Sequence, residues 1–295
     1  MSQGSLALAE TNRLGFSAAL EVAADDNFGF APDDASEREL MSAKASATVS
    51  YQVLAAPQRS LNVAFTPYYR GVGDLEDLSS YGAEIRGTFN QSFLIGRNNA
   101  YVRGLVAADF FEFEDSEPRD GHKLLGEVAF GYSITPRFTA EVGYRAQRRD
   151  QREDRPEGTL NTRETATGPI PNDSSAVFDT ETDGPFARVT YGLTARGSLS
   201  AEFLYTSGTE TATGNARAFN SPERFDSIRD FAFEEGTRFL AWNIETDTQQ
   251  FTVSYSHELS ERFTVSVSAR HQSAQGEAGN DYDNTSVALR IARRF

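Results

Sequence analysis

Long stretches of this 295-residue chain alternate strictly between apolar and polar residues. Near the start, Leu14, Phe16 and Leu20 occupy alternate positions, and near the end Leu289 and Ile291 do the same. On a helix such positions would scatter around the cylinder, whereas a β-strand places them all on one face. The pattern therefore predicts an all-β chain whose strands have one apolar and one polar face.

Twelve segments show this alternation, and most of them have ten or more residues. Strands of globular proteins have about five or six residues, whereas a strand that crosses a bilayer at a tilt needs roughly 9–11. The length of the segments therefore favours membrane-spanning strands. We predict them at residues 12–24, 41–54, 60–70, 80–94, 100–113, 122–134, 137–148, 185–195, 198–207, 248–258, 262–272 and 284–295.

The connections between the twelve segments alternate in kind. Five are short turns, and the six between them are generally longer and mostly acidic. Residues 25–39, for example, hold six carboxylates and one arginine, and the longest loops are expected at 149–184 and 208–247. Hairpins with short turns at one rim and long loops at the other are typical of up-and-down transmembrane barrels.

Composition narrows the functional classes. The chain has no cysteine, a formal net charge of −15, and three histidines that lie far apart in sequence. These features exclude disulfides and thiolate sites and disfavour a histidine zinc site. They also argue against non-specific binding of nucleic acid, which needs a basic surface. No run of 18 apolar residues occurs, so no membrane-spanning helix is expected.

Strands with one apolar face have two possible environments. A soluble β-sandwich turns the apolar faces toward a protein core, whereas a barrel turns them toward lipid and leaves no unpaired edge. The strand lengths and the many Arg and Glu residues within the polar faces favour the barrel over a soluble sandwich or a repetitive adhesin. We predict a closed antiparallel up-and-down transmembrane β-barrel of about twelve strands, with fourteen as the alternative. It would occupy residues 12–295 as a single domain, after an N-terminal tail or leader remnant at residues 1–11.

The end of the chain resembles that of the Gram-negative outer-membrane β-barrel proteins. The chain ends on Phe295, preceded at alternate positions by Val287, Leu289 and Ile291. In that superfamily such an ending is the signal that the barrel-assembly machinery reads; Arg293 departs from the pattern, because an apolar or aromatic residue is usual there. The resemblance indicates no subfamily. It implies a bacterial outer-membrane location, short periplasmic turns, long extracellular loops, and outer-membrane lipid and lipopolysaccharide as partners.

The polar faces supply the side chains of the expected lumen, and basic residues outnumber acidic ones there. Two interpretations of these charges remain open. A positively charged wall would focus its field on passing anions. Alternatively, arginines and glutamates would pair into a network that braces a narrow barrel. The residues predicted to line the pore wall are Arg70, Arg86, Arg103, Lys123, Glu127, Glu141, Arg145, Arg188, Arg270 and Arg290.

Two segments of the last long loop allow further predictions. Ser221 suits a helix N-cap and Pro222 the first helical position, so residues 221–231 are expected to form a short helix, with an irregular surface loop as the alternative. Such a helix would either fold into the barrel or lie on its rim. Residues 238–244 either extend the tenth strand or form an extra strand, which would raise the count to fourteen.

One group of residues near the end of the chain could in principle form a catalytic site. His271 and Ser273 lie two residues apart, and Asn280 and Asn284 follow, an order similar to that of the twelve-stranded outer-membrane phospholipases. A serine nucleophile needs an adjacent base and a group that orients the base. The Asn-Gly pair that follows the serine in that family is absent here. We therefore predict no enzymatic activity, no metal and no cofactor.

The predicted function is that of an outer-membrane channel for passive diffusion of small solutes, with anions as the candidate class. The alternative is a non-catalytic outer-membrane anchor whose long extracellular loops bind a partner, a surface polymer or lipopolysaccharide. A homo-oligomer is compatible with both functions, whereas a nucleic-acid partner is expected for neither.

Overall fold

The structure is a computed structural model that describes residues 14–32, 39–56, 58–93, 99–116, 119–152, 175–215, 219–220, 227–229 and 239–295. Within these ranges nearly every residue belongs to a long strand. The strands are β1 (Leu14–Asp25), β2 (Leu40–Ala56), β3 (Arg59–Val72), β4 (Ser80–Ser92), β5 (Asn99–Phe113), β6 (Gly121–Thr135), β7 (Phe138–Gln151), β8 (Thr180–Gly192), β9 (Gly197–Asn215), β10 (Ser227–Arg229), β11 (Phe239–Glu258), β12 (Phe263–Gly276) and β13 (Tyr282–Arg294). Between them the described residues form the short 3-10 helices η1 (Glu76–Leu78), η3 (Ser175–Phe178) and η5 (Glu277–Gly279).

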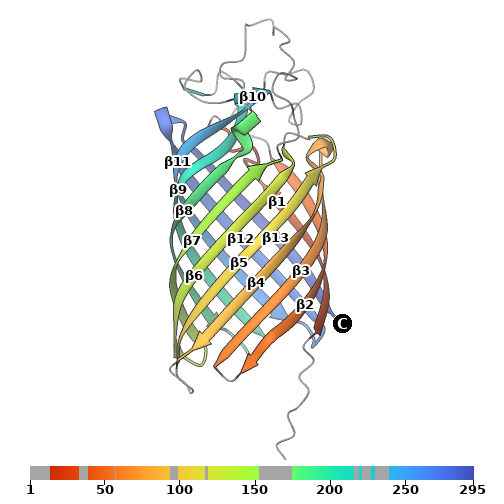
Figure 1. The fold of residues 1–295 in the computed structure, drawn as a ribbon, viewed down its shortest axis with the longest axis vertical. Coiled ribbons are helices and arrows are strands. Elements are labelled where there is room, and N and C mark those ends of the chain that lie inside the picture. The colour runs from red at the N-terminus through yellow and green to blue at the C-terminus, as the bar shows by residue number, and fades with distance from the viewer. Residues whose placement is uncertain are drawn as a thin grey trace, which may run out of the picture.

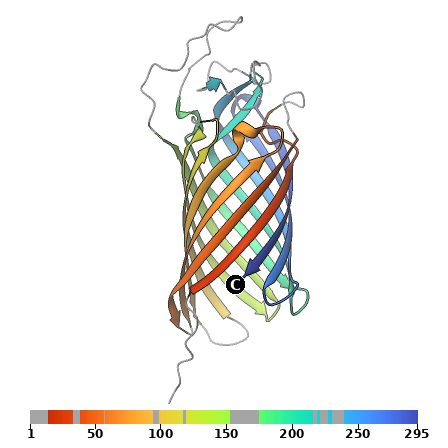
Figure 2. The ribbon, with the colours of Figure 1, turned by 90° about the vertical axis from the view of Figure 1, so that its right-hand side faces the viewer.

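Twelve of these strands close into one antiparallel barrel, in which they are tilted about a common axis (Figures 1 and 2). Neighbouring strands pair in chain order, β9 pairs with β11, and β13 pairs with β1 to complete the ring. Because the ring is closed, the barrel has no free edge along its length. This confirms the predicted all-β barrel of twelve strands and excludes the alternative of two stacked sheets.

The two ends of the barrel differ in their connections. The short turns and the C-terminus lie at one end, here called the turn end, and the longer connections lie at the opposite end, here called the loop end (Figure 1). β1 starts at the turn end, and its residue Phe16 accepts a hydrogen bond from the backbone N–H of Phe295 (3.1 Å). The first and last strands are therefore tied together at the turn end.

The outward face of the barrel is apolar along its middle. Large apolar side chains on this face are exposed, among them Leu20, Phe65, Ile85, Val106, Val142, Val189, Val267 and Leu289. Toward the loop end the band stops at tyrosines whose hydroxyls donate to carboxylates: Tyr81 to Glu112 (2.5 Å), Tyr205 to Asp247 (2.9 Å) and Tyr144 to Asp183. An apolar band that ends on aromatic rings with polar tips is the surface of a transmembrane barrel.

Most predicted strand bounds agree with the structure to within a few residues, and the largest differences lie at the loop end. β8 begins at Thr180 rather than 185, β9 extends to Asn215 rather than 207, and β11 begins at Phe239 rather than 248. Residues 239–244 thus extend β11 along β9, so the barrel has twelve strands and not fourteen. Among the described residues no helix is long and apolar enough to cross a membrane.

The helix predicted at 221–231 is wrong for Ser227–Arg229, which form strand β10. The reason lies in β11. β12 ends at Gly276, opposite Thr246, so the edge of β11 beyond Thr246 has no barrel partner on that side. β10 pairs there, from Ser227 opposite Trp242 to Arg229 opposite Leu240, and so pairs backbone groups that would otherwise be left open. Residues 221–226, 230 and 231 of the predicted helix lie outside the described residues.

Apolar side chains pack inside the loop end of the barrel. Trp242, Ile244 and Tyr282 project inward from β11 and β13 and are almost fully buried. The ring of Phe219 stacks on Trp242 at 3.9 Å between centroids, and Phe30 packs on Tyr282 at 5.3 Å. This cluster attaches the connections that follow β1 and β9 to the barrel wall.

Candidate functional site in the barrel lumen

The middle of the lumen contains a network of three arginines and three glutamates on neighbouring strands β5 to β9. Its members are Arg103, Arg145, Arg188, Glu127, Glu141 and Glu202. The strand register puts unlike charges opposite each other, because Glu127 faces Arg145, and Arg188 faces both Glu141 and Glu202. Directly opposite side chains on one face of a sheet are close enough to pair.

The ion pairs of the network have short N–O distances, and their side chains are poorly exposed. Arg103 Nη2 lies 2.6 Å from Glu127 Oε1 and 3.0 Å from Glu141 Oε2. Arg145 lies 2.8 Å from Glu127 and 3.1 Å from Glu202, and Arg188 pairs with Glu141 at 2.9 Å and also with Glu202. Arg188 also lies 3.7 Å from Glu127. Each arginine thus has at least two carboxylates as partners, and the charges of the six side chains balance. This part of the lumen fits the bracing interpretation rather than a free cationic wall.

Two glycines make room for aromatic rings that support the network. A Cβ on Gly131 would lie 2.2 Å from the ring of Tyr101, whose hydroxyl donates to Glu141 Oε1 (2.8 Å). A Cβ on Gly143 would lie 2.6 Å from the ring of Phe186. The guanidinium groups of Arg145 and Arg188 lie 5.3 and 5.2 Å from that ring, within the range of cation–π contacts. The glycines therefore allow rings to hold the arginines in place.

The opposite wall of the lumen carries many small side chains between its larger polar ones. Inward positions of β1 to β3 and β11 to β13 include Ser17, Ser46, Thr48, Thr66, Ser254, Ser256, Ser266, Ser268, Ala288 and Ala292. Hydroxyls of this wall pair with one another, as in Thr48 with Thr66 (3.0 Å) and Ser266 with Ser256 (3.1 Å). Such side chains reach less far into the lumen than Arg or Glu. Space along the barrel axis is therefore expected beside this wall and not beside the network.

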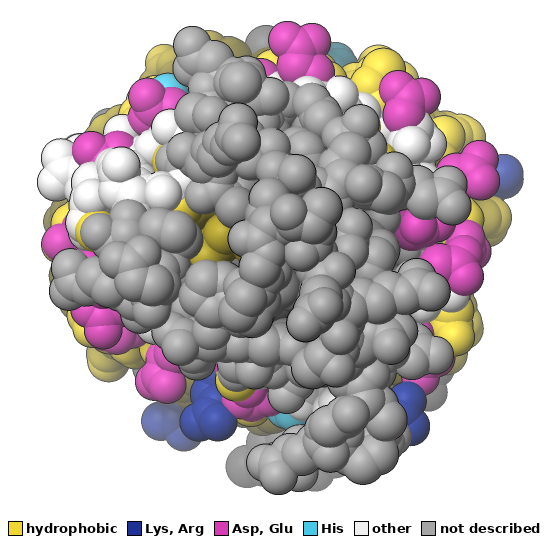
Figure 3. All heavy atoms as spheres, turned by 90° about the horizontal axis from the view of Figure 1, so that it is seen from above, with side chains coloured by type: hydrophobic (Ala, Val, Ile, Leu, Met, Phe, Trp, Pro, Cys, Tyr) yellow, Lys and Arg dark blue, Asp and Glu magenta, His cyan; other side chains and the backbone are white. Residues whose placement is uncertain are grey.

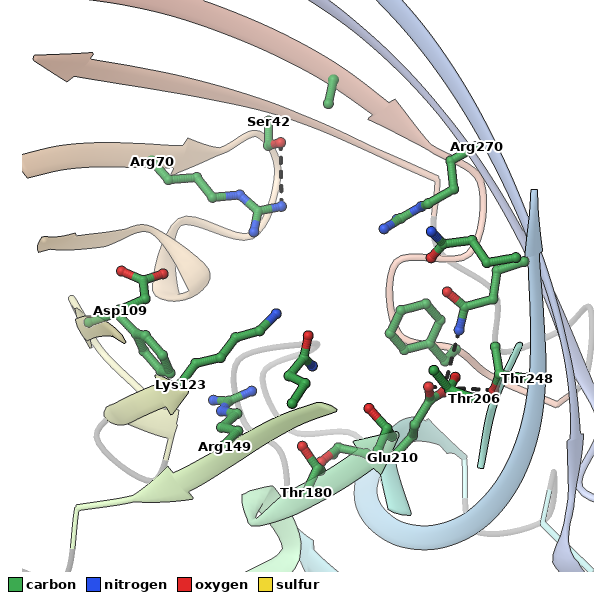
Figure 4. Close-up of a pocket in the computed structure, with 18 of the residues that line it drawn as sticks. Ser42, Arg70, Asp109, Lys123, Arg149, Thr180, Thr206, Glu210, Thr248 and Arg270 are labelled. Atoms are coloured by element: carbon green, nitrogen blue, oxygen red, sulfur yellow. Dashed lines mark hydrogen bonds between the residues drawn. The ribbon is translucent and has the colours of Figure 1, made fainter. Parts of the chain in front are cut away.

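Toward the loop end the lumen widens into a cavity of about 740 Å³. Its lining carries six cationic side chains, Lys44, Arg70, Lys123, Arg145, Arg149 and Arg270, and three acidic ones, Glu21, Asp109 and Glu210. Figure 4 shows Arg70, Lys123, Arg149 and Arg270 reaching into the same space from different parts of the wall. Positive charge therefore exceeds negative charge in the lining of this cavity.

Apart from Arg145, which belongs to both sets, the cavity cations differ from those of the network in their partners. Arg70 Nη2 donates to the Ser42 hydroxyl at 3.5 Å, and Arg270 Nη2 lies 3.8 Å from Asp25 Oδ2. Lys123 lies opposite Asp109 in the register, but Asp109 accepts from Tyr68 (3.2 Å). The acidic Glu210 is engaged by Tyr282, by Thr248 (3.5 Å) and by Gln272 (3.4 Å). Positive charge in the cavity is therefore only weakly compensated.

The remaining residues predicted for the pore wall lie elsewhere in the lumen. Arg86 donates Nε and Nη2 to the two carboxylate oxygens of Glu84, both at 2.9 Å. Arg290 faces Glu21 and Ser266 in the register of β13. Of the predicted set, the structure brings Arg70, Lys123, Arg145 and Arg270 to the cavity and Arg103, Glu127, Glu141, Arg145 and Arg188 to the network. Their role in lining a conducting pore stays a prediction.

Sequence reasoning missed Arg149 and Glu210, which both line the cavity. The predicted strands ended at 148 and 207, so both residues were assigned to loops. For Arg149 a signal existed, because Arg145, Gln147 and Arg149 continue the polar alternation through the end of β7 at Gln151. Glu210 lies in a stretch of β9 with almost no apolar residue, where alternation carries no signal.

The candidate catalytic constellation is not assembled. His271 faces outward and its Nδ1 lies 3.2 Å from Thr285 Oγ1. Asn284 points to the opposite face of the sheet, where its Nδ2 donates to Asp25 Oδ1 (2.5 Å) and to the Asn27 carbonyl (2.8 Å). Asn280 is fully buried and bonded to Asn220 and Glu277. Neither asparagine is therefore in a position to orient His271.

The rim of the loop end is acidic on its outer side. Viewed from above, Asp and Glu side chains are distributed around the perimeter (Figure 3). Exposed carboxylates of the strand ends contribute to this rim, among them Glu181, Asp183, Glu245, Asp247, Asp281 and Asp283. No group of three or more potential metal ligands occurs among the described residues.

No family model matches the chain, and no curated protein matches its sequence. Solved structures do match. An outer-membrane channel from Pseudomonas putida F1 superposes with a TM-score of 0.55 and 11% identity over 95% of each chain. The KdgM porin in complex with disordered oligogalacturonate superposes with a TM-score of 0.46 and 9% identity, over 95% of this chain and 99% of that chain. The Salmonella typhi outer-membrane phospholipase dimer with bound calcium reaches 0.42 and 10% identity, over 94% and 90%.

At such low identity the similarity shows the fold alone. The superposition with the Pseudomonas putida channel covers nearly the whole of both chains. The chain therefore has the barrel fold of that outer-membrane channel.

Proposed function

We propose that this protein is an outer-membrane channel through which small anionic solutes diffuse passively. The observation that carries the proposal is the cavity at the loop end, whose lining holds six cationic and three acidic side chains. The chain as a whole has a net charge of −15, so the positive lining does not follow from the overall composition. A charged passage inside a low-dielectric wall concentrates counter-ions and favours their transit.

Two further observations support passage along the barrel. Small hydroxyl and methyl side chains occupy many inward positions of β1 to β3 and β11 to β13, so space for a solute is expected beside the braced network. The fold is that of an outer-membrane channel. The same proposal places the protein in the outer membrane of a Gram-negative bacterium, in contact with lipid and lipopolysaccharide, with Phe295 as the signal for the barrel-assembly machinery. Self-association of barrels is compatible with it.

Ion selectivity in planar bilayers tests this function. With the full chain inserted and a KCl gradient across the bilayer, we expect open-channel currents whose reversal potential shows that chloride permeates more readily than potassium. A reversal potential that shows cation selectivity would contradict the anionic part of the proposal. Absence of any conductance would contradict the channel itself and favour the anchor with partner-binding loops, whose residues 153–174, 216–218, 221–226 and 230–238 lie outside the described part of the chain.

A further inference from the structure

Within the described part of the chain, four cations of the cavity lack the carboxylate partners that the arginines of the network have. Arg103 and Arg145 each pair with two glutamates, and Arg188 pairs with three. By contrast, Lys44, Arg70, Lys123 and Arg149 form no ion pair among the described residues. Arg270 has one, at the long distance of 3.8 Å. Charged groups held in a protein wall without a partner are costly, so this arrangement is expected where a ligand supplies the missing charge.

The cationic groups are also held in place. The guanidinium of Arg149 lies 5.0 Å from the ring of Phe111 and 5.7 Å from that of Phe178. Its Nη2 donates to the backbone carbonyl of Arg119 (2.8 Å), while its Nε has no hydrogen-bond partner among the residues that the structure describes. Arg70 lies 5.3 Å from the ring of Phe28. Because the side chains are positioned by rings and backbone, little conformational entropy remains to be lost when an anion binds.

The positions of the cations define the kind of ligand. Lys123 and Arg149 come from the neighbouring strands β6 and β7, whereas Arg70 comes from β3 and Arg270 from β12 (Figure 4). A single carboxylate is expected to contact fewer of these cations than a larger anion. An anion with two or more charged oxygen groups can contact two of them at once. The cavity volume of about 740 Å³ falls within the range of roughly 300–1,000 Å³ that is usual for small-molecule sites.

We propose that the cavity is a saturable binding site for small organic or inorganic anions that carry two or more carboxylate or phosphate groups. Lys123 and Arg149 hold one group, and Arg70 or Arg270 holds another. Monovalent anions are retained less well, because they engage fewer of these cations. The proposal rests on the function proposed above in one respect, since the ligand reaches the cavity through the barrel.

Calorimetric titration of the full chain in a zwitterionic detergent tests the site directly. The probes are citrate and pyrophosphate, with acetate at the same ionic strength as the monovalent comparison. We expect saturable binding of citrate, pyrophosphate or both, and at least about tenfold weaker binding of acetate. Which of the two multivalent probes binds more tightly distinguishes carboxylate from phosphate ligands. Equal affinity for acetate, or no saturable binding of either multivalent probe, would overturn the proposal.

Variants locate the site. Lys123→Gln and Arg149→Gln are each expected to weaken binding about tenfold or more, as for loss of a charged hydrogen-bond donor, and Lys123→Arg to retain it. The matched control is Arg148→Gln, which removes the same charge from the residue directly before Arg149 in β7. The side chain of Arg148 is exposed, faces outward and pairs with Asp150. Its binding is expected to be unchanged. Unaltered binding in both cavity variants, or an equal loss in the control, would show that the charge of the cavity does not hold the anion.

Current measurements separate this proposal from the channel function. Citrate added on the loop side of a bilayer is expected to reduce the chloride current saturably, and less effectively in Lys123→Gln. Saturable binding in detergent without conductance would retain the site and overturn the channel. Conductance without saturable binding or block would retain the channel and overturn the site. Unaltered heat-dependent migration on gels would show that each variant is folded.

Discussion

At the scale of the residue, Glu127 is the centre of the mid-barrel network. Its side chain is 4% exposed, less than that of any arginine it contacts. It accepts hydrogen bonds from Arg103 at 2.6 Å and from Arg145 at 2.8 Å. Loss of one partner of a poorly exposed ion pair is costly mainly because the remaining charges stay behind without compensation. Glu127 therefore matters for stability through the two arginines that it neutralises.

We expect Glu127→Gln to lower the free energy of unfolding by about 2–4 kcal/mol. Urea-induced unfolding in lipid vesicles, followed by the fluorescence of the single Trp242, measures it. The control is Glu84→Gln. Glu84 also pairs with an arginine, but the side chains of Arg86 and Glu84 are 44% and 26% exposed, so the loss should stay below about 1 kcal/mol. Equal losses in the two variants would refute a special role of the network.

The direction of the lumen side chains was predictable, but their partners were not. Alternation assigns every second residue of a strand to the same face, and this was enough to place Glu127, Arg145 and Arg188 inside. The pairing of Arg103 with Glu141, however, links strands β5 and β7, which are not neighbours. Such a contact depends on the stagger of three strands, on side-chain length and on the room left by Gly131. None of these can be read from alternation.

At the scale of the element, the strands were predictable where lipid faces them. In the apolar band the outward residues must be apolar, so the sequence carries a period of two. Beyond the band this requirement disappears. Residues Thr206–Asn215 of β9 contain only one apolar residue, Ala212, yet they continue the barrel by pairing with β11. Alternation therefore could not predict β10 or the extensions of β8, β9 and β11. All of these segments lie beyond the apolar band, where outward residues need not be apolar.

The stack of Phe219 on Trp242 should hold the connection after β9 against the barrel wall. Trp242 is fully buried, and Phe219 is 4% exposed. We expect Phe219→Ala to shift the emission of Trp242 to longer wavelength and to raise its quenching by acrylamide, because the ring that covers it is removed. Global unfolding should change much less than for Glu127→Gln, since the twelve strands keep their pairing.

The control for the stack of Phe219 on Trp242 is Phe251→Ala. Phe251 lies on the same strand, β11, but is 50% exposed on the outward face. Its removal should leave the emission and quenching of Trp242 unchanged. An unaltered Trp242 signal in Phe219→Ala would show that the connection after β9 is not held by this stack.

At the scale of the whole molecule, the barrel reverses the usual distribution of side chains. The outward face carries large exposed apolar residues, and the lumen carries the ion pairs and the cationic cavity. Closure of twelve strands makes this possible, because it satisfies the backbone and leaves the outer face to the lipid. The lumen is in turn uneven, with a braced wall of Arg and Glu on β5 to β9 and small side chains on the other side.

This arrangement predicts a strong dependence of stability on position when a charge is placed on the outer face. Val106 lies in the middle of β5 and is 66% exposed on the apolar band, so Val106→Arg should cost about 2–4 kcal/mol of unfolding free energy in lipid vesicles. Gln249→Arg is the control, because Gln249 is exposed beside Tyr205, at the loop-end edge of the band. There the same side chain should cost at most about 1 kcal/mol, since it reaches the aqueous interface. Equal costs at both positions, measured by urea unfolding, would mean that the middle of the outer face is not in contact with hydrocarbon. The transmembrane assignment would then fail together with the channel built on it.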